Sequence, residues 1–80
     1  MKIQLLKGSF TPKEIEKILT ELIHVKIRFH EEKIKNDDDE ETIKMREHRI
    51  IKLQKELFEV RKYITNSSTN IMVDSEINLI

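Results

Sequence analysis

The 80-residue sequence predicts a mainly α-helical protein: a long antiparallel helical hairpin with short β-strands at both ends, which dimerises into a four-helix bundle. Charged residues make up 38% of the chain, whereas glycine and proline contribute one residue each, a composition typical of long helices with an exposed polar face. Apolar residues recur at helical spacing in two segments and alternate with polar residues near both ends. We therefore expect a single domain over 1–80.

The first element is expected to be a short strand over about 2–6, where Ile3 and Leu5 alternate with Lys2 and Gln4. A glycine and a serine then interrupt the alternation. This amino end is too short and too polar for a signal peptide, and no uncharged apolar run is long enough to cross a bilayer. We expect a cytoplasmic protein that does not contact a membrane.

The second element is expected to be a helix over about 12–35. Thr11 is a good N-cap, Pro12 suits the first helical position, and Glu14 completes a capping box with Thr11. Two lysines near the carboxyl end suit the helix dipole, and Asn36 can end the helix in a left-handed conformation. Local signals alone therefore define both ends of this helix.

This first helix carries two apolar stripes, rotated from each other by about a third of a turn. The first stripe consists of Ile15, Ile18, Leu22, Val25 and Phe29. The second stripe consists of Leu19, Ile23, Ile27, His30 and Ile34. Together the stripes are too wide for one neighbouring helix, so we expect two neighbours.

An acidic connector leads to a second helix over about 39–65, with Asp38 as the expected N-cap and Glu41 as its capping-box partner. The connector is short enough to force an antiparallel hairpin. Apolar residues follow a coiled-coil heptad pattern along this helix, with Arg46 at one position that should be apolar. The seam consists of Ile43, Ile50, Leu53, Leu57, Val60 and Ile64, and is broadened by Ile51 and Phe58.

A polar linker is expected over 66–70, followed by a second strand over about 71–79 in which Ile71 and Val73 begin an apolar alternation. A helical hairpin returns the chain to its starting end. The second strand is therefore expected to lie antiparallel to the first, either within one chain or between two chains.

Self-association is the strongest inference from these patterns. A chain of this length is near the size at which a single core barely offsets conformational entropy, and it has no cysteine for disulfides. We therefore expect a homodimer that acts as a protein-interaction or regulatory module, with another protein as a further partner. The alternative is a monomer whose terminal strand folds back over the second stripe.

Four polar residues are expected near the centre of the bundle, namely Lys26, His30, Arg46 and Glu47. The favoured interpretation is structural, with His30 bonded to Glu47 in the core and the Lys26 ammonium reaching the edge. A pH switch at His30 is the alternative, because histidine changes charge near neutrality. A pocket lined by all four residues would be needed for catalysis, and no catalytic motif is present, so we expect no enzyme.

No metal ion or other cofactor is expected. Glu21 and His24 have the spacing found in di-iron bundles, but the chain has no second such pair and His24 points away from the apolar stripes. The aspartates over 37–39 lack the spacing and the glycine of a calcium-binding loop, and helix capping explains them better.

The order of a strand followed by two helices, with Lys2 and Gln4 facing outward, resembles the ribbon-helix-helix repressors, which read DNA with paired strands. The resemblance covers element order only, and it implies a DNA-binding regulator as the alternative function. Fifteen basic and fifteen acidic residues cancel, and the basic residues of the second helix alternate with glutamates. Nucleic acid is therefore not the expected partner.

Overall fold

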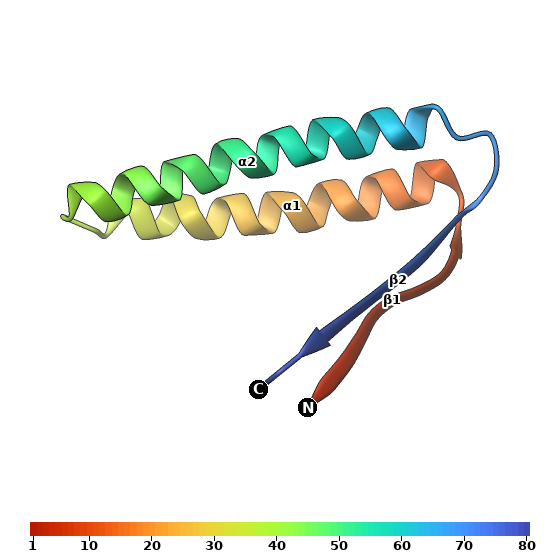
Figure 1. Ribbon diagram of the computed structural model, residues 1–80, viewed down its shortest axis with the longest axis horizontal. Helices are drawn as coiled ribbons and strands as arrows, with labels where there is room; N and C mark the ends of the chain where they lie inside the picture. The colour runs from red at the N-terminus through yellow and green to blue at the C-terminus, as the bar shows by residue number, and fades with distance from the viewer.

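A computed structural model describes residues 1–80 and contains two helices and two strands. The elements are β1 (Lys2–Phe10), α1 (Pro12–Lys35), α2 (Glu40–Thr65) and β2 (Ile71–Asn78). Figure 1 shows α1 and α2 side by side and antiparallel, with the strand pair leaving from the end that joins α1 to β1. The predicted helical hairpin with terminal strands is confirmed.

The start of α1 is held by the capping box at Thr11. The Glu14 N–H donates to the Thr11 hydroxyl at 3.1 Å, and the Thr11 N–H donates to the Glu14 carboxylate at 2.8 Å. Hydrogen bonding of the Glu14 carboxylate by the Thr11 backbone N–H, and then by the Thr11 side chain, lowers the pKa of Glu14 because it favours the charged form. At the other end Asn36 has φ −104°, so the expected left-handed stop is wrong; its side-chain amide donates instead to the Glu32 carbonyl at 3.1 Å.

The N-cap of α2 is Asp39, so the expectation of Asp38 is wrong by one residue. The Asp37 carboxylate accepts the Asp39 N–H at 2.9 Å, which closes a local turn and carries the chain one residue further before the helix begins. The Asp39 carboxylate then accepts from the Glu41 N–H at 3.3 Å and from the Thr42 hydroxyl at 2.7 Å. Glu41 therefore contributes its backbone rather than a capping-box side chain.

β1 and β2 pair antiparallel within one chain, from Lys2 opposite Asn78 to Phe10 opposite Ile71. β1 extends beyond the expected 2–6 because Gly8 does not break it. Gly8 has φ +137°, a backbone conformation that residues with a side chain rarely adopt. In this conformation Gly8 pairs with Val73 of β2. Glycine thus bends the strand and lets the pairing continue to the start of α1.

A β-bulge at Leu5 shifts the alternation of β1 by one residue. The Gln4 amide holds the bulge by donating to the Leu6 and Ser75 carbonyls at 3.2 and 2.8 Å. As a result Ile3 lies on the same face as Leu6, although simple alternation would place these two residues on opposite faces. We call this surface the hairpin apolar face; it consists of Ile3, Leu6, Phe10, Ile71, Val73 and Ile77.

The core is small, because only four of the 80 residues are buried: Ile15, Leu53, Leu57 and Ile64. The second stripe of α1 is half-buried along its whole length, which places it against α2. The strand pair contacts α1 only at its base and then diverges from it, on the side opposite α2 (Figure 1). The molecule is consequently flat and open, with extents of 47 × 32 × 13 Å.

Leu57→Asp is expected to unfold the chain. It places a carboxylate without a partner in the seam between the helices, at a cost of about 4 kcal/mol or more in the free energy of unfolding. Lys55→Asp, two residues away on the exposed side of α2, is the control and should change stability by about 0.5 kcal/mol or less. Thermal unfolding followed by far-UV circular dichroism measures both; equal melting temperatures for Leu57→Asp and wild type would place the seam elsewhere.

Candidate functional site

The most prominent surface feature is an exposed apolar strip on α1, formed by the first stripe beyond its buried start. The relative exposure of Leu22, Val25 and Phe29 is 36%, 53% and 55%. We call these three residues the α1 flank. They lie about one helical turn apart, and the second stripe occupies most of the contact with α2. Phe29 also lies near α2, because the Arg46 guanidinium is 5.8 Å from the centroid of its ring. A continuous apolar strip of this kind is typical of an interaction site.

The hairpin apolar face is a second exposed apolar surface. At its base it joins the helices in an open apolar groove of about 300 Å³. The groove is lined by Ile15, Leu19, Glu59, Val60, Tyr63, Ile64, Ile71 and Val73. Further along the hairpin, Ile3 and Ile77 face each other across the strands and are 39% and 40% exposed. The groove is lined by residues of α1, α2 and β2 and by none of the α1 flank, so the flank and the hairpin apolar face are two separate exposed apolar surfaces.

The sixteen residues expected in the core or interface divide into three groups. Those buried within the chain are Ile15, Leu53, Leu57 and Ile64. Those half-buried are Ile18, Leu19, Ile23, Ile27, Ile34, Ile43, Ile50 and Val60. Those exposed are Leu22, Val25, Phe29 and Phe58. Phe58 and Ile51 lie on the outer side of α2 and do not broaden its seam with α1.

The polar residues expected at the centre are arranged differently from the prediction. His30 and Arg46 are half-buried and in contact, whereas Lys26 and Glu47 are exposed. The partner of His30 is Arg46, whose Nη1 lies 3.1 Å from the imidazole Nδ1, so the expected bond to Glu47 is wrong. Arg46 has a longer side chain than Glu47 and lies on the seam between the two helices. Glu47 is the next residue along α2, so helical rotation places its side chain outside the seam.

This contact fixes the protonation of His30. A guanidinium can only donate hydrogen bonds, so Nδ1 accepts and the imidazole proton lies on Nε2. Burial lowers the pKa of His30, and the positive charges of Arg46, Arg49 and Lys26 lower it further. His30 is therefore neutral at neutral pH, and its Nε2–H is a free donor.

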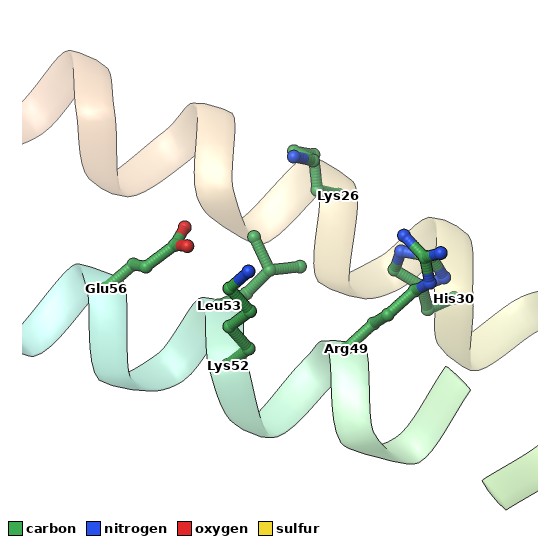
Figure 2. A pocket seen from close by; sticks show the side chains of 6 residues that line it. All are labelled: Lys26, His30, Arg49, Lys52, Leu53 and Glu56. Atoms are coloured by element: carbon green, nitrogen blue, oxygen red, sulfur yellow. The ribbon is translucent and has the colours of Figure 1, made fainter. Parts of the chain in front are cut away.

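A second pocket, of about 160 Å³, lies between α1 and α2 beside His30 (Figure 2). Its lining includes Lys26 and His30 but neither Arg46 nor Glu47, so the four residues considered for catalysis do not line one site. The positions that sequence reasoning missed are Arg49, Lys52 and Glu56. Their spacing of three and four residues places them on one side of α2, a signal that was present in the sequence.

Groups that would suit a metal ion or DNA are not assembled in this fold. No three histidine, aspartate or glutamate side chains lie close enough to hold a metal ion. The polar face of the strand pair sets Lys7 opposite Asp74 and Gln4 opposite Glu76, so it presents no net positive charge to a phosphate backbone. Neither helix has the length of apolar sequence that a bilayer crossing requires.

Comparison with known proteins yields no match to any family model, to any curated protein or to any solved structure.

The pKa of His30 predicts how stability depends on pH. The unfolded chain binds a proton at His30 more readily than the folded chain, so stability is fully present above about pH 6.5 and is lost as the pH falls through that value toward the lower folded pKa. Protonation of Nδ1 would also break the bond from Arg46.

His30→Gln should reduce this acid-dependent loss, as measured by urea unfolding at a series of pH values. His24→Gln and His48→Gln are matched controls, because both histidines are exposed, and both variants should follow the wild-type profile. A His30→Gln profile identical to wild type would show that folding does not perturb His30.

Proposed function

We propose that this chain is a small, non-catalytic protein-interaction or regulatory module that works as a homodimer. The observation that carries the proposal is the exposed α1 flank, a strip of large apolar side chains on a helix whose other stripe already packs on α2. A second copy is the occupant we propose. A homodimer buries such a strip against an identical one across a two-fold axis, which needs no further partner.

The surface area of the single chain supports a second copy. A compact monomer of 9.6 kDa exposes about 5,100 Å², whereas this chain exposes 6656 Å², an excess of about 1,600 Å². Its radius of gyration is 15.2 Å, against about 12 Å for a compact domain of this length. Obligate homodimers bury about 1,000 to 2,500 Å² on each chain, and the excess lies within that range.

In the proposed dimer the α1 flanks of two copies pack together and complete a four-helix bundle. In this proposal the hairpin apolar faces of both copies also contribute to the interface, because they are exposed apolar surfaces joined to the helices at their base. A two-stranded sheet is marginal alone, so contact with a second copy would stabilise it. A cytoplasmic location is part of this proposal, and fractionation of the native cell tests it.

Val25→Glu is expected to separate the dimer. Val25 is at the middle of the α1 flank, and a buried glutamate facing its own copy across the two-fold axis raises the dissociation constant by about 30-fold or more. Sedimentation equilibrium across a dilution series should give twice the 9.6 kDa chain mass for wild type and a shift toward the single mass for the variant.

His24→Glu is the matched control, since it introduces the same side chain at the preceding exposed position, outside the flank. This variant should remain dimeric over the same range of protein concentrations as the wild-type chain. A wild-type mass of 9.6 kDa at the highest concentration would overturn the proposal, as would a Val25→Glu variant that dimerises as tightly as His24→Glu.

A further inference from the structure

We propose that the pocket between α1 and α2 beside His30 binds a phosphate-type dianion, either inorganic phosphate or the phosphate group of a small phosphomonoester. The pocket is lined by Lys26, His30, Arg49, Lys52, Leu53 and Glu56. This inference is independent of the proposed dimer, because it concerns a polar site formed entirely within one chain.

The residues that line the pocket carry a net positive charge. Lys26, Arg49 and Lys52 contribute three positive charges and Glu56 contributes one negative charge, while His30 is neutral. Two positive charges are therefore in excess at this point of a chain whose overall net charge is zero. A dianion balances this excess, whereas a single carboxylate does not.

None of the cations of the pocket forms a salt bridge with an acidic residue, although the chain has fifteen acidic residues. The one ion pair within 4.0 Å in the whole chain joins Arg61 to Glu16, and it lies outside the pocket. Neither Lys26 nor Arg49 has a hydrogen-bond partner in the chain, so their donors are available to a ligand. Like charges held together in this way repel one another unless an anion joins them.

The hydrogen-bond donors of the pocket, and the space between them, also suit a phosphate group. Figure 2 shows Lys26 and His30 on α1 and the other lining residues on α2, with Arg49 extending toward His30 and Glu56 at the opposite end. A guanidinium, an ammonium and the His30 Nε2–H together match the oxygens of a phosphate. The volume of about 160 Å³ is about five times that of one liquid water, which leaves room for a tetrahedral anion.

Arg46 lies behind His30 and does not itself line the pocket. Its Nε is buried and has no hydrogen-bond acceptor in the chain, while its Nη1 is occupied by His30. A buried donor without an acceptor is costly. Arg46 adds positive charge behind His30, and the charges of Arg46, Arg49 and Lys26 all lower the pKa of His30. Glu56 is the one acidic residue in the lining of the pocket.

The test is an NMR titration of the three histidine side chains in the whole chain, with inorganic phosphate, glycerol phosphate, or chloride at equal ionic strength. A bound dianion favours the charged imidazole, so the pKa of His30 should rise with phosphate and not with chloride. His24 and His48 are internal controls, because both are exposed and neither lines the pocket, and their imidazole signals should respond to phosphate no more than to chloride.

Two variants assign the binding to the pocket. Arg49→Gln and Lys52→Gln should each weaken phosphate binding by about tenfold or more, since each removes a charge-assisted bond. Lys55→Gln removes an exposed lysine of the same helix outside the pocket and should change affinity by less than about twofold. Circular dichroism checks that each variant is folded. If Arg49→Gln unfolds, Lys52→Gln still tests the proposal, because Lys52 is exposed and its substitution leaves the core intact.

Equal affinity for both phosphate probes would assign the site to the phosphate group alone, and tighter binding of glycerol phosphate would assign it to an esterified ligand. The proposal is overturned if His30 does not respond to phosphate, or if all three histidines respond equally. It is also overturned if Lys55→Gln weakens binding as much as Lys52→Gln. None of these readouts requires the dimer, so failure of one proposal leaves the other standing.

Discussion

The side chains of Leu53, Leu57 and Ile64 pack against the second stripe of α1, and this contact uses the apolar seam of α2. It leaves the first stripe of α1 largely uncovered, and Ile51 and Phe58 stay exposed on the outer side of α2. The imbalance has a simple origin: α1 has two apolar stripes and α2 has one. Because the hairpin contacts α1 only at its base, the chain has no other element with which to cover the α1 flank. The open shape and the exposed flank both follow from this single contact.

Much of the fold could be read from the sequence, because the decisive signals are local. The capping box at Thr11 and the heptad pattern of α2 each depend on residues within one or two helical turns. The bulge at Leu5 could not be read in this way. It is fixed by the Gln4 amide reaching the carbonyl of Ser75, a contact between opposite ends of the chain. Alternation within β1 alone therefore could not place Leu6 on the same face as Ile3.

The polar site was harder to predict for a related reason. Lysines and arginines that alternate with glutamates along one helix are typical of a solvated face, and Arg49, Lys52 and Glu56 fit that description when α2 is considered alone. Their excess charge becomes apparent only when Lys26 and His30 are brought in from α1. Helical rotation gives the side of the helix on which a residue lies, but the axial offset between two helices decides which residues come into contact. This offset brings Arg46, and not Glu47, into contact with His30.

The two proposed sites are neighbours on α1, and this has a consequence for how they would act together. Lys26 follows Val25 directly and lies one turn from Leu22 and Phe29, so a second copy on the α1 flank would exclude water from the side of Lys26. Lower local polarity strengthens the attraction between the ammonium and a bound dianion, and it increases the cost of leaving the ammonium unpaired. Because coupling between two binding equilibria is reciprocal, an anion that binds more tightly to the dimer must also tighten the dimer by the same factor.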